Sequence, residues 1–259
     1  MKLAQFVAVA VVGVVSVSVQ AKEWKTIRFG VAPAYAPFEY LAPNGKVQGF
    51  DIDLGNALCA QLKAKCEWVE NDFDGMIPAL AARKFDAINS AMNITAKRKE
   101  KVSFTEPLYQ VPIMLVAKAG SGLLPTAAAL KGKSIGTQQG TTQEAYANKH
   151  LAPAGVRVVS YQTQELVYAD MVSGRLDGTL LDGPVASESF LKRPQGKGFA
   201  FAGGPLRDVE VLGVGSGIAV RKEDNELREA LNGAFKALKA NGTFDRLVKK
   251  YFEMDIAAN

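Results

Sequence analysis

Short apolar strands alternate with helices along this chain, and no other feature of the sequence restricts its fold so strongly. Leu54, Leu58 and Leu62 recur at the spacing that places them on one face of a helix. The predicted strands are 26–31, 66–70, 86–89 and 133–137, and the predicted helices are 53–62 and 76–83. A strand–helix–strand order of this kind predicts an α/β fold built on parallel sheets.

One unit of this alternation occurs twice. The segment 79–88 runs from a helix through a basic turn and an apolar-Asp-small triplet into a strand, and the segment 170–179 repeats that order. An extended run at 109–117 lies between the two copies, and a Gly-rich, β-like run at 211–220 follows the second copy. We therefore expect two α/β units joined by two crossings of the chain, an arrangement suited to a hinged cleft.

The C-terminal part is predicted to form two helices. Apolar residues from Leu227 to Leu238 share one helical face, and Asn241 with Gly242 is a typical helix end. Thr243 is expected to cap the helix that follows.

The first residues have the layout of a signal peptide. Lys2 provides a short positive start, and 6–15 is apolar apart from one glycine. Val19 and Ala21 then occupy the positions that precede a cleavage site. The segment 1–21 is therefore predicted to be a signal peptide that exports the chain to the periplasm. The alternative is an uncleaved N-terminal anchor, although the apolar run is short for a membrane span.

Composition excludes several functional classes. Hydrophobic residues make up 48% of the 259 residues, which is enough for a sizeable core. The net charge of +5 is spread along the chain, and Glu100 interrupts even the densest basic run, so we expect no nucleic-acid partner. His150 is the only histidine, which excludes a Ser-His-Asp triad and a His-rich zinc site. We expect no metal and no cofactor.

The two cysteines, Cys59 and Cys66, are seven positions apart. In an exported chain this pair predicts a disulfide. The alternative is a pair of free buried thiols.

A collinear series of motifs resembles one known family, the periplasmic solute-binding proteins of polar amino acid ABC transporters (solute-binding protein family 3), and in particular the lysine/arginine/ornithine- and histidine-binding receptors. The motifs are Tyr35-Ala-Pro-Phe38, Gly49-Phe-Asp-Ile-Asp-Leu54, Asp72-Phe-Asp-Gly-Met-Ile-Pro-Ala-Leu80, Phe85-Asp-Ala-Ile88, Ile94-Thr95 with Lys97-Arg98, Gln139-Gly-Thr-Thr-Gln-Glu-Ala-Tyr-Ala147, Gly174-Arg-Leu-Asp-Gly178, Asp182 and Asn241-Gly-Thr243. The Cys59–Cys66 spacing also matches the disulfide of the cationic amino acid receptors. The likeness covers essentially the whole chain after residue 21.

The resemblance implies the two-lobed periplasmic binding protein fold of type II, in which two crossover strands form a hinge. The boundaries that it implies are 22–110 and 212–259 for lobe I, 111–211 for lobe II, and 110–113 and 207–215 for the hinge crossings. It also implies a monomer that binds a small amino acid and delivers it to the permease subunits of an ABC transporter, without catalysis.

The resemblance assigns roles to three charged or polar residues. Arg98 lies in a charged run, where an arginine is usually a surface residue, but the family places its planar guanidinium on the ligand carboxylate. Thr142 lies in the pattern Thr141-Thr-Gln-Glu144, a capping box that opens a helix, and the family places it against the ligand. Asp182 ends an apolar strand at the expected cleft edge, a suitable position for binding the ligand ammonium.

Further ligand-binding residues are expected around these three. Backbone groups of Ser90, Ala91 and Asn93, with the Ser90 hydroxyl, are expected to complete the hydrogen bonds to the ammonium and the carboxylate. The remaining candidates are Tyr35 and Phe73, matched to the aromatic residues that sandwich the ligand side chain in the family, and Gln138 and Gln143, which flank the capping box. Ordinary core packing is the alternative for the two aromatic residues.

The sequence departs from the family pattern at two positions. Ala32 replaces an acid that the cationic amino acid receptors typically carry three residues before the tyrosine, and Asn93 replaces a serine. The partner of a distal ligand cation is then Glu39, Asp51 or Asp72, or water. Arginine, lysine, ornithine or histidine is the leading ligand class.

Other functions remain as alternatives. One is a receptor for another polar amino acid or an opine-like conjugate, and another is an enzyme similar to cyclohexadienyl dehydratase on the same scaffold. A sensor role would use the same closed form to signal through a separate protein.

Overall fold

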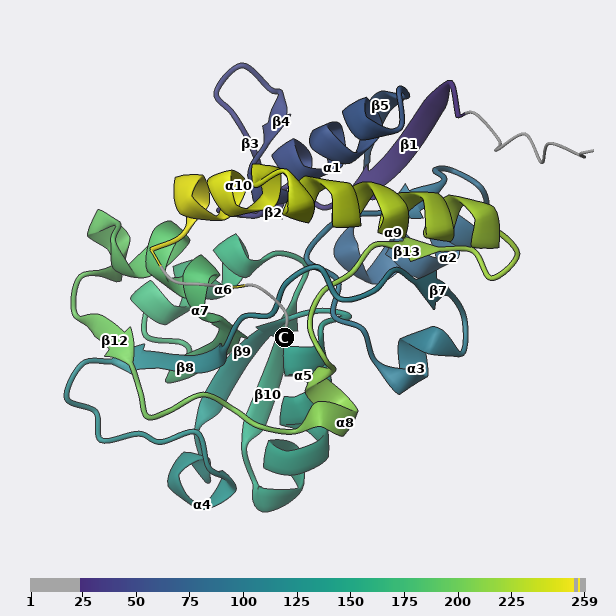
Figure 1. Cartoon of the computed structure of the whole chain (residues 1–259). Coiled ribbons are helices and arrows are strands. Elements are labelled where there is room, and N and C mark those ends of the chain that lie inside the picture. Colours follow the sequence, from purple (N-terminus) through teal and green to yellow (C-terminus); the bar gives the residue numbers. More distant parts are fainter. Residues whose placement is uncertain (1–23, 254–255, 257–259) are drawn as a thin grey trace, which may run out of the picture.

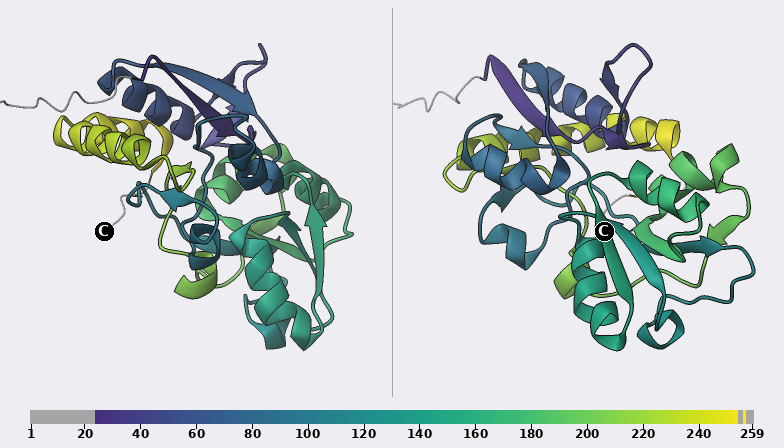
Figure 2. Two further views of the ribbon diagram at one scale, coloured as in Figure 1. Left: turned by 90° about the vertical axis from the view of Figure 1, so that its right-hand side faces the viewer. Right: turned by 180° about the vertical axis from the view of Figure 1, so that it is seen from behind.

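The computed structural model describes residues 24–253 and Ile256, so the predicted signal peptide, 1–21, lies outside the described residues. The described residues form two lobes (Figure 1). Segments from both ends of the chain, coloured purple, blue and yellow, form lobe I, and the central segments, coloured teal and green, form lobe II; Figure 2 shows the same division from two other directions. The predicted two-lobed α/β fold is confirmed.

The sheet of lobe I has the strand order β5-β1-β6-β13-β7. Its strands are β1 (Thr26–Val31), β5 (Lys65–Glu70), β6 (Ala87–Ile88), β7 (Ser103–Phe104) and β13 (Ala219–Val220). β1 runs parallel to β5 and β6, whereas β13 runs antiparallel to β6 and β7. The expected parallel strands thus form one side of this sheet, and β13 adds to it in the opposite direction because the chain returns there from lobe II.

The helices of lobe I are α1 (Phe50–Gln61), α2 (Met76–Ala81), α3 (Ala96–Lys99), α9 (Asn225–Ala240) and α10 (Thr243–Tyr251). The apolar face of α9 is buried as predicted, with Leu227, Leu231 and Leu238 almost inaccessible to solvent. Thr243 does not cap α10 as expected. Gly242 occupies the cap position with a φ of 71°, and the Thr243 hydroxyl accepts a hydrogen bond from Arg246 Nη2 instead.

A small three-stranded sheet carries the Tyr35 motif. It has the order β2-β3-β4, with β2 (Ala34–Tyr35), β3 (Glu39–Leu41) and β4 (Val47–Gln48). Tyr35 and Glu39 are paired across β2 and β3. Since paired residues project to the same face of a sheet, this turn brings an aromatic ring and a carboxylate to one place.

The sheet of lobe II has the strand order β10-β9-β11-β8-β12. Its strands are β8 (Ile113–Lys118), β9 (Ser134–Gln138), β10 (Arg157–Tyr161), β11 (Gly178–Asp182) and β12 (Phe199–Phe201). The accompanying α-helices are α4 (Ala127–Leu130), α5 (Thr142–Tyr146), α6 (Gln164–Val172), α7 (Gly183–Val185) and α8 (Val209–Leu212). Here too the parallel set, β10, β9 and β11, is extended by antiparallel strands, β8 and β12.

Shorter 3-10 and π-helical turns complete both lobes. The 3-10 turns are η1 (Phe73–Gly75), η3 (Ala152–Ala154) and η5 (Pro194–Gly196), and the π-helical turns are η2 (Ala147–Leu151) and η4 (Ala186–Leu191).

The repeated unit seen in the sequence has the same place in each lobe. Its first copy is the end of α2 and the strand β6, and its second copy is the end of α6 and the strand β11. Both strands lie in the middle of their sheets, each parallel to the neighbouring strand β1 or β9. The polar residues that follow β6 and β11 therefore lie at corresponding edges of the two sheets.

The second crossing differs from the expected β-like run at 211–220. Asp208 Oδ1 accepts a hydrogen bond from the Val211 main-chain nitrogen at 3.0 Å, which starts the helix α8, and Gly213 ends it with a φ of 86°. Only β13 is a strand in this run. The aspartate cap and the left-handed glycine impose a helical turn that β-propensity alone does not predict.

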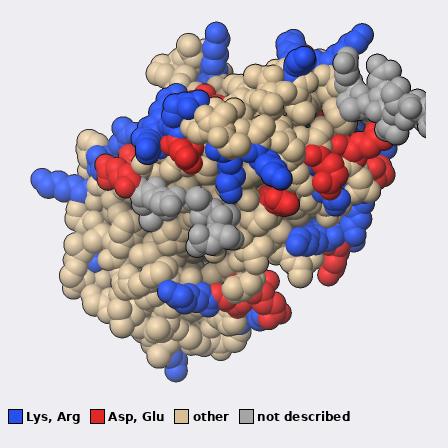
Figure 3. Space-filling view, in the orientation of Figure 1, with Lys and Arg blue, Asp and Glu red and all other residues tan. Residues whose placement is uncertain are grey.

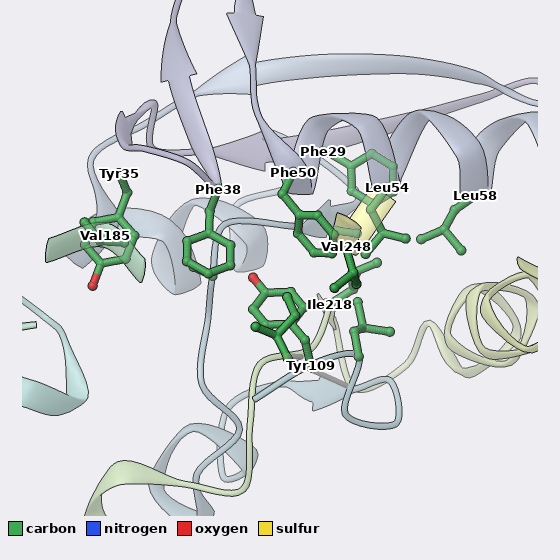
Figure 4. Close-up of a cluster of buried hydrophobic side chains, with 14 of the residues drawn as sticks. Phe29, Tyr35, Phe38, Phe50, Leu54, Leu58, Tyr109, Val185, Ile218 and Val248 are labelled. Atoms are coloured by element: carbon green, nitrogen blue, oxygen red, sulfur yellow. The ribbon is translucent and has the colours of Figure 1, made fainter. Parts of the chain in front are cut away.

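A continuous set of buried apolar side chains extends from lobe I into lobe II. Figure 4 shows part of this set, with Phe38, Phe50 and Tyr109 close together, and it includes Tyr35 of lobe I and Val185 of lobe II. The predicted disulfide is confirmed and joins α1 to β5 through Cys59 and Cys66.

The surface carries interspersed charges. On the face shown in Figure 3, basic and acidic side chains lie beside one another on the upper lobe, and much of the lower lobe is neither. Lys250 with Asp53 and Lys192 with Glu253 are two such neighbouring pairs. Among the described residues, none of the helices has the length and apolar character needed to cross a membrane.

Candidate ligand-binding cleft

A cavity lies between the two lobes and encloses about 330 Å³ of space between atoms, including solvent at its mouth. The lining residues are Ala32, Tyr35, Glu39, Phe73, Ser90, Ala91, Asn93, Arg98, Gln138, Thr141, Thr142, Gln143 and Asp182. Every ligand-binding residue predicted from the sequence is in this set, so the structure brings all of them together.

Arg98 enters the cavity from the short helix α3. Thr95 caps this helix by accepting a hydrogen bond from the Arg98 main-chain nitrogen at 3.2 Å. The guanidinium donates from Nη1 to the Asn93 carbonyl oxygen at 2.7 Å and from Nη2 to the Gly140 carbonyl oxygen at 2.9 Å. Burial lowers the pKa of Arg98 to about 10, so the side chain stays charged at neutral pH.

The Arg98 guanidinium also lies over an aromatic ring. Its central carbon is 5.5 Å from the centre of the Phe73 ring, which comes from the 3-10 turn η1. A cation at this distance is attracted by the π face, so Phe73 helps to fix the orientation of the guanidinium.

The predicted threonine cap is present at the start of α5, while the reciprocal bond of Glu144 goes to the residue before the cap. Thr141 Oγ1 accepts from the Glu144 main-chain nitrogen at 3.1 Å, and Glu144 Oε2 accepts from the Gly140 main-chain nitrogen at 2.8 Å. This arrangement leaves the neighbouring Thr142 hydroxyl free to face the cleft. There it accepts a hydrogen bond from Asn93 Nδ2 at 2.9 Å, across the boundary between the lobes.

Asp182 is the last residue of β11 and is buried. Gln143 Nε2 donates to its Oδ1 at 2.8 Å, and its main-chain nitrogen donates to Tyr35 Oη at 3.4 Å. Burial raises the pKa of Asp182 to about 7, although Tyr35, Gln143 and the charge of Arg98 oppose the shift. A carboxylate that is so poorly solvated gains strongly from a cation placed beside it.

Glu39 is the lining residue that sequence reasoning named only as one of several options. It is almost fully buried, its Oε1 accepts from Ser90 Oγ at 2.9 Å, and its Oε2 has no hydrogen-bond partner among the described residues. Ser90 Oγ in turn accepts from the Ala32 main-chain nitrogen at 3.0 Å. Burial raises the pKa of Glu39 well above its usual range.

Glu39 lies close to Ala32, the position at which the sequence carries an apolar residue in place of the acid of the family pattern. The two residues are joined through Ser90 and line the same cavity, so an acid is present at this end of the cleft although position 32 is apolar. This placement depends on the β2–β3 pairing of Tyr35 with Glu39, which no pattern in the sequence predicts.

Asp51 supports the cleft from behind. It is fully buried, its Oδ2 accepts from the Ala91 main-chain nitrogen at 2.7 Å, and its two oxygens accept from Tyr109 Oη at 2.9 and 3.0 Å. Burial raises the pKa of Asp51 to about 6. Ala91 has a φ of 44°, a conformation that costs a non-glycine residue energy, so Asp51 helps to hold the strained turn that forms the cavity wall.

Metal binding has no support in the described part of the chain, which contains no group of three or more His, Cys, Asp or Glu side chains placed to hold an ion. The charges that line the cavity are instead one guanidinium and two buried carboxylates.

A cleft between two hinged lobes, lined by groups of both charges, defines a binding protein for a small charged solute. Comparison with known proteins gives the family: residues 27–254 match the bacterial extracellular solute-binding proteins, family 3. The chain belongs to this family, as the resemblance predicted.

Two relatives show how close the similarity is. The chain is 49% identical to the histidine-binding periplasmic protein of Salmonella typhimurium over 89% of this chain and 88% of the relative. It is 47% identical to the lysine/arginine/ornithine-binding periplasmic protein of Escherichia coli over 90% of this chain and 89% of the relative.

A solved structure agrees with these relatives. An ancestral arginine-binding protein bound to arginine superposes with a TM-score of 0.82 at 34% identity and covers 89% of this chain and all of that chain. The two relatives are named as periplasmic binding proteins, and the solved structure as an arginine-binding protein.

Proposed function

We propose that this protein is the periplasmic substrate-binding subunit of an ABC importer and that it binds a cationic amino acid, namely arginine, lysine, ornithine or histidine. The family and the names of the relatives support a polar amino acid as the ligand. The chain acts as a monomer that delivers its ligand to the permease subunits.

One observation supports the cationic class in particular, which is the set of charges in the cavity. Arg98 provides one positive charge, and Asp182 and Glu39 provide two negative charges when ionised. A cationic amino acid carries the complementary set: one carboxylate, one ammonium and a second cation on its side chain. Because burial raises the pKa of Glu39, a neutral amino acid would leave this side chain protonated, whereas a cationic side chain would favour its ionised form and gain its attraction.

The roles follow from where each group lies. Arg98 binds the ligand carboxylate through its planar fork, with the Thr142 hydroxyl beside it. Asp182 binds the ammonium, and Gln143 holds its Oδ1 in place. Glu39 binds the distal cation of the ligand side chain.

Neutral residues complete the proposed site. Tyr35 and Phe73 pack against the stem of the ligand side chain. The other expected ligand contacts are the backbone groups of Ser90, Ala91 and Asn93, the Ser90 hydroxyl and the Gln138 side chain, from residues that all line the cavity.

Capture works through closure of the lobes about the crossings at 110–113 and 207–215. Ligand that binds one lobe gains contacts from the other as the cleft closes, and these additional contacts shift the population to the closed form. The permease then recognises a surface that includes both lobes.

A thermal-shift screen of ligand-stripped protein against all amino acids, ornithine, citrulline and opines tests the proposal. We expect melting temperature to rise with one or more of the four cationic amino acids, since a ligand that binds only the folded state stabilises it. A rise only with a neutral or conjugated ligand would contradict the cationic class. If none of the amino acids raised the melting temperature, the whole proposal would be contradicted.

We further propose that the protein catalyses no reaction. Its cavity carboxylates have binding roles: Asp182 for the ammonium and Glu39 for the distal cation. Incubation with prephenate and arogenate tests this directly, with no dehydration product expected. Multiple turnovers of either compound would show that the chain is a dehydratase.

A further inference from the structure

Asn93 connects three parts of the molecule. Its Nδ2 donates to Thr142 Oγ1 of lobe II at 2.9 Å, and its Oδ1 accepts from Ser216 Oγ at 3.1 Å. Its main-chain oxygen accepts from Arg98 Nη1 at 2.7 Å. One residue of lobe I is thus bonded to the opposite lobe, to the chain that returns from lobe II, and to the guanidinium of the cleft.

The contact with Ser216 links Asn93 to both crossings. Ser216 forms isolated β-bridges with Asn93 and with Tyr109, and Tyr109 directly precedes the first crossing. A rotation of the lobes about the crossings must therefore change either the Asn93–Ser216 contact or the Asn93–Thr142 contact.

The bond to Thr142 joins the lobes through protein atoms alone. Three further bonds cross between the lobes: Arg98 Nη2 to the Gly140 carbonyl oxygen, the Asp182 main-chain nitrogen to Tyr35 Oη, and, at the surface, Lys192 Nζ to Glu253. The Asn93–Thr142 bond differs from these three because both its atoms belong to neutral side chains that substitution can remove without altering a charge.

We infer that Asn93 is a positioning residue that ties the hinge to the opposite lobe, stabilises the closed form before ligand contacts are made, and holds Arg98 toward the incoming carboxylate. The inference rests on the hinged closure proposed above but not on the identity of the ligand. One neutral hydrogen bond shifts a two-state equilibrium by about two- to tenfold. A larger closed population before binding raises the observed affinity by the same factor while that population is small.

The test measures closure in protein that contains no amino acid. Both cysteines are in the disulfide, so new cysteines at Lys101 and Asn148, which line opposite sides of the groove between the lobes, take spin labels selectively. Pulsed dipolar spectroscopy then gives the populations of short and long distances between the labels.

Three substitutions are compared in this labelled background. We expect Asn93→Ser, whose side chain is too short to reach Thr142, to lower the short-distance population about two- to tenfold. Thr142→Val should do the same, and the double variant should show no further loss, because both changes remove one bond. Asn56→Ser, which removes a hydrogen bond to Trp68 within lobe I, should leave the populations unchanged.

Ligand titrations supply the second readout. Asn93→Ser should weaken binding of every ligand by a similar factor, equal to the measured loss of the closed population, and keep their order of preference. An unchanged distance distribution in Asn93→Ser, fully additive effects in the double variant, or no short-distance population in the parent protein would each overturn the inference. None of these results depends on the cationic specificity, so the two proposals fail separately.

Discussion

Arg98 donates a hydrogen bond from Nη2 to the carbonyl oxygen of Gly140 across the cleft, at 2.9 Å. Its other terminal nitrogen, Nη1, donates to the Asn93 carbonyl oxygen at 2.7 Å. Both acceptors are neutral, so they orient the guanidinium without neutralising its charge. A ligand carboxylate can therefore gain the electrostatic attraction of this half-buried cation.

Removal of the Arg98 guanidinium should abolish high-affinity ligand binding. We expect Arg98→Ala to lower affinity by at least about 3 kcal/mol, the scale for losing one partner of a buried charge pair. Arg98→Lys should recover only part of this loss, because an ammonium cannot bind a carboxylate bidentately. Calorimetric titration measures both, with Arg193→Lys on lobe II as a control. Near-normal affinity in Arg98→Ala would remove the carboxylate assignment.

Asp182 should contribute to ligand affinity through its negative charge rather than through its shape. Asp182→Asn keeps an oxygen that accepts from Gln143 Nε2, so we expect the fold to persist. Affinity should nevertheless fall by at least about 2 kcal/mol, because the ligand ammonium loses its buried counter-ion. The matched change Asp177→Asn, elsewhere in lobe II, should have little effect on the same titration. Equal affinities for the two variants would place Asp182 outside the ligand contacts.

Binding should strengthen as pH rises from 5 to 8. Burial raises the pKa of Asp182 to about 7, so the free protein holds a proton there at lower pH. A ligand ammonium favours the ionised form, and binding must then release that proton, which weakens affinity by up to about tenfold per pH unit below pH 7. Burial also raises the pKa of Glu39. A cationic ligand side chain favours its ionised form, so binding would release a proton from Glu39 as well and weaken at low pH in the same way.

Titrations in buffers of different ionisation enthalpy measure this proton release. The release should shrink in Asp182→Asn, because the substituted side chain holds no titrating proton. Affinity that stays constant or falls between pH 5 and pH 8 would contradict the proposed pairing of Asp182 with an ammonium.

The disulfide should stabilise the fold without affecting ligand choice. Cys59 and Cys66 close a loop with a sequence separation of seven, for which chain entropy gives about 2.5 kcal/mol. We expect Cys59→Ala with Cys66→Ala to lower the melting temperature by about 5–10 °C. The order of ligand affinities should not change, because α1 and β5 pair behind the cleft. A reversed order of preference would show that the disulfide shapes the site.

Much of the site could be predicted because its residues lie in contiguous motifs. Thr142 and Asp182 follow recognisable local patterns, a capping box and the end of an apolar strand, whereas Arg98 was assigned by the family resemblance because a charged run alone indicates a surface residue. These patterns fix local structure, and the repeated α/β unit places the ends of β6 and β11 at corresponding edges of the two sheets.

Contacts between distant segments could not be predicted. The Glu39 carboxylate enters the cavity because β2 pairs with β3 and because Ser90 connects Glu39 to Ala32. Neither contact produces a periodic residue pattern from which it could be predicted. The antiparallel β13 and the helical turn α8 were missed for a similar reason, since both depend on where the chain returns from lobe II.

The most direct test of the account is a calorimetric comparison of arginine with citrulline on ligand-stripped protein at pH 8, where Asp182 is ionised. The two ligands have nearly the same shape, but the guanidinium of arginine is charged and the ureido group of citrulline is neutral. Our account predicts that arginine binds at least about tenfold more tightly and that Glu39→Gln removes most of this difference. Equal affinities for the two ligands in the parent protein, or a preference for citrulline, would contradict a cleft built for a cationic amino acid.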